Sequence, residues 1–271
     1  MTNVSPSRYI IHGGQQGADR LSILAHAMWP FTRPFLHEAG LQSGMKCLDI
    51  GCGNGAITMR IFSEIGPTGE ITGVDFDPAI IQIAKQNSVP HQSNVHFQVL
   101  DIENHNLDSC AYDFIFCRFL LSHLKSPEAA LQKINSALRP NGILAVEDVD
   151  VAGHFCHPPS SAFRRYVELY ERAGIKKGVN PLIGPILPEL LESRGIRDVG
   201  LKVVLPTFRN GEGKQMALLT MLGIQESVVS VGLATEEEVQ QIIRDLRLYT
   251  EDEHTIISFP RIFQVNGKNA P

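Results

Sequence analysis

Three glycines stand at alternate positions directly after a short apolar run, and this stretch offers the clearest binding chemistry of the chain. Residues 45–56 read MKCLDIGCGNGA, with Asp49 inside the apolar part and Gly51, Gly53 and Gly55 after it. A strand that runs into a glycine-rich turn and then a helix exposes unpaired backbone N–H groups, and glycine has no Cβ to keep a ligand away from the main chain. The stretch therefore predicts a site for a nucleotide-like ligand.

Acidic residues follow the next apolar runs at positions that suit the rest of such a ligand. Asp75 ends the run GVD, 24 residues after Gly51, and a carboxylate there can accept hydrogen bonds from both hydroxyls of a ribose. Asp101 ends VLD, where it can accept from an exocyclic amine. Glu147 and Asp148 end a further run. Together these carboxylates suit one ligand that contains an amine, an adenosine and a positive charge.

These residues need strands that bring them to one edge, and the hydrophobic pattern of residues 45–150 predicts such an arrangement. Apolar runs of strand length alternate with segments that have helical periodicity. This alternation is typical of a parallel, doubly wound α/β sheet, in which ligands bind beyond the carboxyl ends of the strands. The expected strands cover residues 46–50, 70–75, 95–101, 112–119 and 142–148, and the expected helices cover 56–65, 78–87 and 127–138.

The segments LDIGCGNG, GVDFD, VLDIEN and LRPNGILAVED together resemble the motif series of the class I S-adenosylmethionine-dependent methyltransferases. This resemblance implies a Rossmann-like, seven-stranded and mostly parallel sheet whose last strand is antiparallel. It also implies S-adenosyl-L-methionine as the cofactor and S-adenosyl-L-homocysteine as the product. The residues that it assigns to the cofactor are Asp49, Gly51 and Gly53 for the methionine end, Asp75 for the ribose, Asp101 for the adenine amine, Phe76 and Ile102 beside the ring, and Cys117 or Arg118 near the methionyl part.

Two shorter segments narrow the resemblance. CRFLLSHL followed by a Pro-started helix is similar to the small-molecule branch of these enzymes, which includes quinone-biosynthesis C-methyltransferases. The N-terminal segment YIIHGGQQGADRL, which ends in Arg20 and Leu21, resembles natural-product methyltransferases whose extra N-terminal helix closes over the cofactor. It implies that Tyr9 folds over the ligand. We therefore expect a small, partly apolar acceptor such as a secondary metabolite.

Methyl transfer from a sulfonium is an in-line displacement whose leaving group is already activated. Holding the acceptor and the methyl group at near-attack distance can therefore supply much of the acceleration. A base is needed only if the acceptor is a hydroxyl, an acidic carbon or a protonated amine. Position in the sequence gives His123, Glu147, His154 and His157 as candidates. His123 is the first choice because it follows the fourth strand on the ligand side, and Glu147 is kept beside it.

The remaining chain is expected to complete the sheet and to cover the site. Residues 1–40 predict an N-terminal helical cap, residues 41–150 the Rossmann-like core that binds S-adenosylmethionine, and residues 151–271 the rest of the sheet with an inserted helical lid over the acceptor. Pro260 lies inside the expected last strand, where proline removes a ladder donor. The regular strand therefore either begins at Arg261 or is interrupted by a bulge.

Composition and charge argue against several other classes. The formal net charge is −5 and no long Lys/Arg run appears, so no nucleic-acid partner is expected. No apolar run approaches the ~18 residues that span a bilayer, and the N-terminus lacks a targeting pattern, so no membrane partner is expected. The five cysteines are scattered without a CxxC pair, which fits a reducing cytoplasm better than a disulfide framework or a zinc site. We expect no bound metal. A homodimer through an exchanged N-terminal helix is a further hypothesis.

Two other functions stay open at this point. GCGNGA satisfies the loose dinucleotide pattern, and Asp75 falls near the expected ribose position, as in an NAD-dependent oxidoreductase. Asp49 and Asp101, which that fingerprint does not need, favour the methyltransferase. The third hypothesis is a protein that binds the cofactor without catalysis, because nothing in the sequence proves that an acceptor is methylated.

Overall fold

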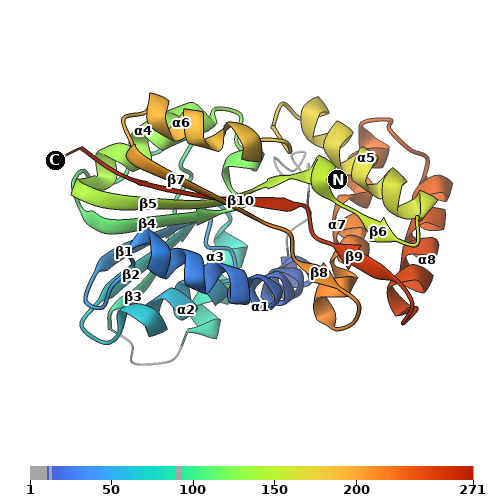
Figure 1. Cartoon of the computed structure of the whole chain (residues 1–271), viewed down its shortest axis with the longest axis horizontal. Coiled ribbons are helices and arrows are strands. Elements are labelled where there is room, and N and C mark those ends of the chain that lie inside the picture. The colour runs from blue at the N-terminus through green and yellow to red at the C-terminus, as the bar shows by residue number, and fades with distance from the viewer. Residues whose placement is uncertain (1–10, 12–13, 89–92, 271) are drawn as a thin grey trace, which may run out of the picture.

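The computed structural model describes residue 11, residues 14–88 and residues 93–270 (Figure 1). Within these residues the strands form a seven-stranded sheet in the order β3-β2-β1-β4-β5-β10-β7 and a three-stranded sheet in the order β6-β9-β8. The first five strands of the large sheet are parallel, and β10 runs antiparallel to both of its neighbours. The predicted Rossmann-like sheet with an antiparallel last strand is confirmed.

The elements of the described residues have the following bounds. The strands are β1 (Lys46–Ile50), β2 (Glu70–Asp75), β3 (Val95–Val99), β4 (Tyr112–Arg118), β5 (Leu138–Asp150), β6 (Cys156–His157), β7 (Arg197–Val204), β8 (Thr207–Phe208), β9 (Ile256–Ser258) and β10 (Arg261–Lys268). The helices are α1 (Gly14–Ala39), α2 (Ala56–Ile65), α3 (Pro78–Asn87), α4 (Pro127–Ala137), α5 (Ser161–Lys176), α6 (Leu187–Ser193), α7 (Met216–Ser230) and α8 (Glu236–Glu251). Short 3-10 turns are η1 (Leu121–His123), η2 (Val151–Gly153), η3 (Gly184–Ile186) and η4 (Glu212–Gln215).

Helices α2 and α3 begin and end at the expected residues because local signals fix both ends. Gly55 precedes α2 with φ 77°, and Gly66 ends it with φ 73°, a conformation that favours glycine. Pro78 occupies the first turn of α3, where its missing N–H costs nothing. The side chain of Asp77 caps the same helix by accepting a hydrogen bond from the Ala79 backbone N–H at 2.8 Å.

Alternate residues of β4 show how the large sheet is covered on both faces. Phe114 and Phe116 point into a buried cluster with α1 and α2, whereas Ile115 and Cys117 point into a cluster with α4 and α6. Figure 1 shows α1, α2 and α3 on one side of the sheet and α4 and α6 on the other. Because side chains of a strand alternate between the two faces, neighbouring residues of β4 serve opposite layers.

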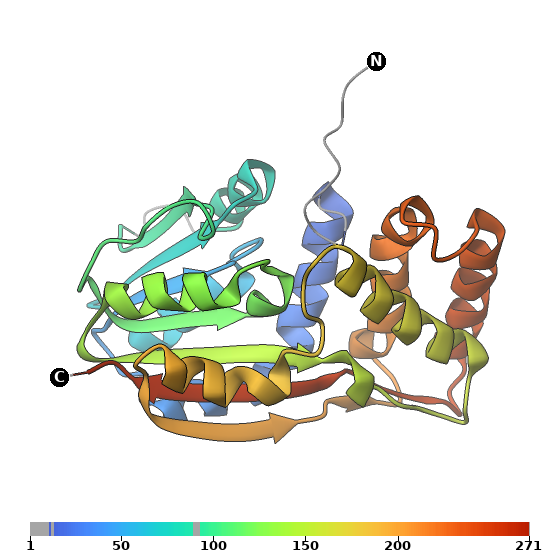
Figure 2. The same ribbon diagram turned by 90° about the horizontal axis from the view of Figure 1, so that it is seen from above.

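A second lobe of α5, α7 and α8 stands beyond the carboxyl ends of the central strands, and Figure 2 shows α1 between this lobe and the sheet. The buried cluster of this lobe includes Leu169, Met221, Ile224 and Leu246, and it continues to Met28 of α1. The small sheet β6-β9-β8 connects the lobe with the large sheet. We refer to α5, α7 and α8 below as the lid.

The chain changes sheets at Pro260, which settles the alternative posed by the sequence. Ser258 ends β9 in the small sheet, and Arg261 begins β10 in the large sheet opposite Asp150. Pro260 lies between the two strands, so its missing N–H removes no ladder hydrogen bond. The regular strand therefore begins at Arg261.

Helix α1 is the longest helix of the described residues, with 26 residues and two internal prolines, Pro30 and Pro34. It packs against α2 and the sheet at one end and against α7 at the other. Neither α1 nor any other helix in the described part of the chain has the length and apolarity needed to cross a membrane. The domain boundaries near residues 40 and 150 stay predictions.

Candidate active site

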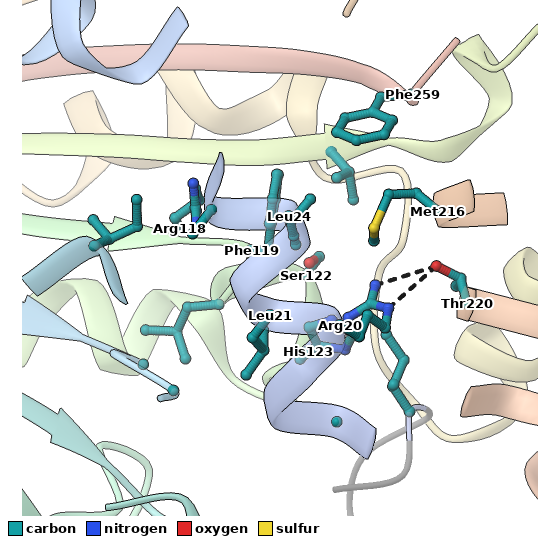
Figure 3. Close-up of a pocket in the computed structure, with 18 of the residues that line it drawn as sticks. Arg20, Leu21, Leu24, Arg118, Phe119, Ser122, His123, Met216, Thr220 and Phe259 are labelled. Carbon is teal, nitrogen blue, oxygen red and sulfur yellow. Dashed lines mark hydrogen bonds between the residues drawn. The ribbon is translucent and has the colours of Figure 1, made fainter. Parts of the chain in front are cut away.

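A cavity of about 270 Å³ opens at the carboxyl ends of β1, β2 and β4 (Figure 3). Its other walls come from α1, from α5 and α7 of the lid, and from the junction of β9 and β10. The cavity therefore connects the edge at which a ligand was predicted with the helices that were expected to cover an acceptor.

The glycine turn after β1 forms part of the wall of this cavity. Gly51 and Gly53 have φ values of 74° and 54°, in the left-handed region that side chains rarely adopt. A Cβ on Gly53 would lie 2.8 Å from Cδ1 of Leu21 on α1, so the helix presses directly on the turn. Asn54 fixes this contact by donating from Nδ2 to the Ala18 carbonyl at 2.8 Å and to Ser22 Oγ at 2.7 Å.

Asp75 lies at the end of β2 and faces the turn. Its Oδ2 accepts from the Gly53 backbone N–H at 3.0 Å, and its Oδ1 accepts from the Asp77 backbone N–H at 3.1 Å. Burial raises the pKa of Asp75, and these two hydrogen bonds oppose the rise. Asp75 and Phe76 both line the cavity, so the predicted ribose position and the predicted ring contact lie next to the glycine turn.

A smaller cavity adjoins the first and contains the predicted adenine residues. Asp101 and Ile102 line it together with Phe76. The carboxylate of Asp101 accepts from the Glu103 backbone N–H at 3.0 Å and from Asn104 Nδ2 at 2.7 Å, which fixes its orientation. β3 ends at Val99, two residues before the expected end, so Asp101 belongs to the following turn.

Asp49 and Arg118 both line the cavity and influence each other electrostatically. Thr58 Oγ1 donates to Asp49 Oδ2 at 2.6 Å. Burial raises the pKa of Asp49 to about 6, while the Thr58 hydrogen bond and the nearby Arg118 oppose the rise. One terminal nitrogen of Arg118, Nη1, is buried and has no hydrogen-bond partner among the described residues. It is a donor available to an anionic group bound in the cavity.

The assignment of Cys117 to the cofactor site is not supported. Arg118 lines the cavity, but its neighbour Cys117 is fully buried in the cluster formed with α4 and α6. The two side chains point to opposite faces because they are consecutive in β4. Burial raises the pKa of the Cys117 thiol well above its ordinary value, so it is an uncharged packing group.

Glu147 is likewise absent from the cavity wall, and the expectation that it acts as a base is not supported. Its side chain is fully buried inside β5. Oε2 accepts from Thr32 Oγ1 of α1 at 2.8 Å, and Oε1 accepts from Gln264 Nε2 of β10 at 2.7 Å. Burial raises the pKa of Glu147, and Arg118 opposes this rise. The carboxylate therefore joins α1, β5 and β10.

His123 lies in η1 after β4 and borders both cavities. Figure 3 shows its ring beside the side chain of Arg20. Burial and, to a smaller extent, the charge of Arg20 lower the pKa of His123 to about 4. The ring is thus neutral at pH 7 and can accept a proton from a bound molecule.

Of the two histidines that follow β5, only His154 lines the cavity, and His157 is exposed outside it. The Nδ1 atom of His154 lies 2.8 Å from the Val151 carbonyl oxygen, so Nδ1 carries the proton and Nε2 stays an acceptor. Burial lowers the pKa of His154 to about 4. Sequence reasoning considered this residue but did not select it.

Sequence reasoning assigned no role to a polar cluster on the lid side of the cavity. Arg20 was part of the N-terminal pattern, yet its contact with Thr220 of α7 bridges 200 residues and leaves no local signal. Tyr166 and Tyr170, one turn apart on α5, complete the cluster. Their spacing of four residues could have indicated a shared helix face. Tyr9, the remaining predicted cofactor residue, lies outside the described residues.

Comparisons with known proteins show which families and structures this chain resembles. Residues 41–180, more than half of the chain, match the family model described as a methyltransferase domain. A demethylmenaquinone methyltransferase of Staphylococcus aureus strain JH9 is 25% identical over 174 residues, which cover 64% of this chain and 66% of that protein. The chain thus aligns with slightly less than two thirds of this relative's length.

Solved structures share the fold at low sequence identity. Phosphoethanolamine N-methyltransferase 2 of Haemonchus contortus, solved in complex with S-adenosyl-L-methionine, superposes with a TM-score of 0.58 at 17% identity, covering 99% of this chain and 61% of that one. The [4+2]-cyclase SpnF superposes with a TM-score of 0.52 at 19% identity, covering 96% of this chain and 85% of that one. Similar folds therefore occur in proteins named for different reactions.

Proposed function

The chain belongs to the methyltransferase domain family, and from that premise we propose that it transfers a methyl group from S-adenosyl-L-methionine to a small, partly apolar acceptor. The observation that carries this proposal is one cavity that contains both the glycine turn after β1 and apolar side chains of the lid. The match to the methyltransferase family argues against the alternative function, an NAD-dependent oxidoreductase.

The residues around the glycine turn fit the cofactor. The turn at Gly51 and Gly53 lets a ligand approach the main chain, and Asp75 supplies two carboxylate oxygens at the ribose position. Arg118, with its buried and unpartnered Nη1, fits the carboxylate of a methionine group. Asp49, adjacent to Arg118, fits the ammonium of the same group.

We assign the adenine to the position of the smaller cavity, on the basis of the residues that line it. Asp101 offers carboxylate oxygens to the exocyclic amine, and Phe76 and Ile102 supply apolar contact for the ring. In this assignment the smaller cavity holds the base and the larger cavity holds the methionine end together with the acceptor. The assignment uses every predicted cofactor residue among the described residues except Cys117.

The chain's own residues then have two tasks in the reaction. When bound, the cofactor supplies a methyl group on a positively charged sulfur. This sulfur is the leaving group, and it needs no protonation. The cavity walls hold the acceptor near this methyl group and exclude water. His123, neutral at pH 7, takes a proton from the acceptor where the acceptor is a hydroxyl or an acidic carbon. The Nε2 atom of His154 is a second acceptor for such a proton.

Apolar side chains favour an acceptor with an apolar body. Leu24 of α1, Val149 of β5, Met216 of α7 and Phe259 line the cavity beyond the glycine turn. The side chains of Met216 and Phe259 are buried and apolar, so they favour contact with rings or short chains. A small molecule fits this space, in keeping with the predicted small-molecule branch.

Calorimetric titration with S-adenosylhomocysteine and, separately, NADH tests the proposal. We expect binding of the first only, followed by release of S-adenosylhomocysteine when the protein receives S-adenosylmethionine and a panel of hydroxylated aromatic acceptors. Gly53→Ala should weaken binding, because φ at this position is 54°, which disfavours a side chain, and because the added Cβ would stand at the turn where the ligand approaches the main chain. Gly232→Ala is a matched control, since Gly232 also has a positive φ, 67°, but has no atom within 4 Å of the added Cβ.

Each outcome has a distinct meaning. Binding of NADH alone would overturn the proposal. Binding of S-adenosylhomocysteine without turnover of any acceptor would support the version in which the fold binds the cofactor without catalysis. Equal effects of Gly53→Ala and Gly232→Ala would mean that the glycine turn acts through stability and not through the ligand.

A further inference from the structure

Arg20 directs its guanidinium toward the lid side of the cavity (Figure 3). Its Nε and Nη2 atoms both donate to Oγ1 of Thr220, each at 3.3 Å. A guanidinium carries five N–H donors, and two long hydrogen bonds to one hydroxyl oxygen satisfy little of this capacity. Donors of Arg20 therefore remain available to a molecule in the cavity.

Within the part of the chain that the structure describes, no carboxylate forms an ion pair with Arg20. None of the ion pairs formed by the described residues includes it. The acidic groups that act on it are the phenols of Tyr166 and Tyr170. Burial raises the pKa of Tyr166 to about 12 and raises that of Tyr170 as well, so both phenols are neutral at pH 7. A partly buried cation without a counter-ion is costly unless a ligand provides one.

The groups around Arg20 are neutral hydrogen-bonding groups. His123 is held uncharged by burial and by Arg20 itself. The His154 ring forms T-shaped contacts with the rings of Phe163 and Tyr166, and its Nδ1 is hydrogen-bonded to the Val151 carbonyl. The lid side of the cavity therefore carries one positive charge, several hydrogen-bonding groups and no carboxylate among the described residues that line it there.

Apolar residues border the same cavity as this cationic group. Leu24, Met216, Ala217 and Phe259 line the same cavity. A ligand that matches both surfaces has an apolar body and a negative group at one edge. A protonated amine would place like charges together at Arg20, which is unfavourable in a partly buried site.

On the basis of the proposed function, we propose that Arg20 selects an acceptor that carries an anionic oxygen, either a carboxylate or an ionised hydroxyl, on an otherwise apolar body. Thr220 is the positioning residue that holds the guanidinium through Nε and Nη2. Arg20 thus binds the acceptor, while the groups near Gly53, Asp75 and Arg118 bind the cofactor.

Titration of the full-length protein with three naphthalene probes tests this inference, in the absence and in the presence of saturating S-adenosylhomocysteine. The probes are 2-naphthoate, its neutral methyl ester and 2-naphthol. We expect the naphthoate to bind about tenfold or more tightly than the ester, as for a hydrogen bond to a charged group. The naphthol, compared at pH values below and above its own ionisation, distinguishes a preference for an ionised hydroxyl from one for a carboxylate.

Arg20→Gln should remove the difference between naphthoate and ester, and Arg20→Lys should keep part of it because it keeps the charge. Arg164→Gln is the matched control, since Arg164 is exposed on α5 and does not line the cavity. Affinity for S-adenosylhomocysteine should stay within about twofold in Arg20→Gln, a change of less than 0.5 kcal/mol. Circular dichroism shows whether each variant folds, and the Lys variant carries the test if the Gln variant does not.

Three results decide the matter. Naphthoate that binds no better than its ester in the wild-type protein overturns the inference. A loss of S-adenosylhomocysteine binding in Arg20→Gln with an unchanged naphthoate preference also overturns it, because Arg20 would then serve the cofactor. A naphthoate preference that depends on Arg20 in a protein that fails to bind S-adenosylhomocysteine supports the anion site and rejects the proposed function.

Discussion

The two sides of the cavity are built from different parts of the backbone. On the cofactor side, a glycine turn and carboxylates at successive strand ends come together because parallel strands share an edge. On the lid side, the lining side chains come from four separate elements, α1, α5, α7 and η1. The sheet topology places the polar groups of the cofactor side along one edge. The polar groups of the lid side lie on separate helices, whose faces meet only in the folded chain.

Charge differs between the two sides as well. The cofactor side is rich in carboxylates, among them Asp49, Asp75 and Asp101. The lid side carries Arg20 and the neutral ring of His154. A cofactor with a cationic centre suits the first side, and an anionic acceptor suits the second. The predictions below test whether this division holds.

His123 borders both cavities and gives the largest expected effect. His123→Gln should lower kcat roughly 1000-fold for an acceptor that must lose a proton, as is usual for loss of a general base. Steady-state kinetics and calorimetry measure turnover and S-adenosylhomocysteine affinity, and the affinity should change by less than about threefold. His157→Gln is the control because this exposed residue lies outside the cavity. A parallel loss of cofactor affinity would assign His123 to the cofactor side.

Asp75→Ala should weaken binding of S-adenosylhomocysteine about 100-fold, because the variant removes charge-assisted hydrogen bonds to a ribose. Asp75→Asn keeps one acceptor oxygen and should lose less. Calorimetry with the purified variants measures both affinities, and binding of the naphthalene probes should not change. An unaltered affinity for S-adenosylhomocysteine would reject the ribose assignment.

A fall in pH should change the stability of the fold in opposite directions through Asp49 on the cofactor side and His154 on the lid side. The folded pKa of Asp49, about 6, exceeds its unfolded value, so this group stabilises the fold as the pH falls through 6. The folded pKa of His154, about 4, is below its unfolded value of 6.5, so stability is lost as the pH falls from 6.5 toward 4. Each variant that removes one of these groups should therefore shift the dependence of Tm on pH in its own direction.

Thermal melts from pH 7.5 to pH 4 measure these shifts. Relative to wild type, the Tm of Asp49→Asn should decline as the pH falls, and that of His154→Gln should rise. The differences should reach several °C, since about 1 kcal/mol corresponds to roughly 2–4 °C for a chain of this size. Parallel curves for both variants would contradict the assigned charge states.

Cys117→Ala should have the smallest effect on the cavity. The thiol packs between the sheet and α4, so its removal should cost about 1 kcal/mol of unfolding free energy. Affinity for S-adenosylhomocysteine should stay within about twofold of wild type. Denaturant unfolding and calorimetry check the two values. A larger loss of affinity would restore Cys117 to the cofactor side.

Local rules in the sequence predicted much of the cofactor side. β1, β2, α2 and α3 have the expected bounds because a strand–turn–helix unit is fixed by residues that are close together in the chain. Asp49, Asp75 and Asp101 then reach the cavities because the ends of parallel strands share an edge.

The predictions for Glu147 and Cys117, which the structure does not support, have two causes. Side chains alternate between the two faces of a strand, and some contacts join residues that are far apart in the sequence. β5 continues to Asp150, so Glu147 is inside the strand and not at its end. Its partners Thr32 and Gln264 are 115 and 117 residues away, which no spacing rule can reveal. Cys117 and Arg118 are neighbours in sequence but face opposite layers.

The lid side was the least predictable part of the site. Helical periodicity can indicate the apolar face of a helix, but it does not show which other helix that face meets. The contact between Arg20 and Thr220 depends on the placement of α1 against α7, a result of tertiary packing. For this reason the sequence supplied the fold and the cofactor but no specific acceptor.

Helix α1 presents two consecutive side chains to the two sides of the cavity, Leu21 to the glycine turn and Arg20 to the lid. A displacement of this single helical turn by either bound molecule alters the site of the other. Thermodynamic reciprocity then requires each molecule to change the affinity of the other by the same factor. Any such cooperativity between the two molecules would depend on one turn of α1.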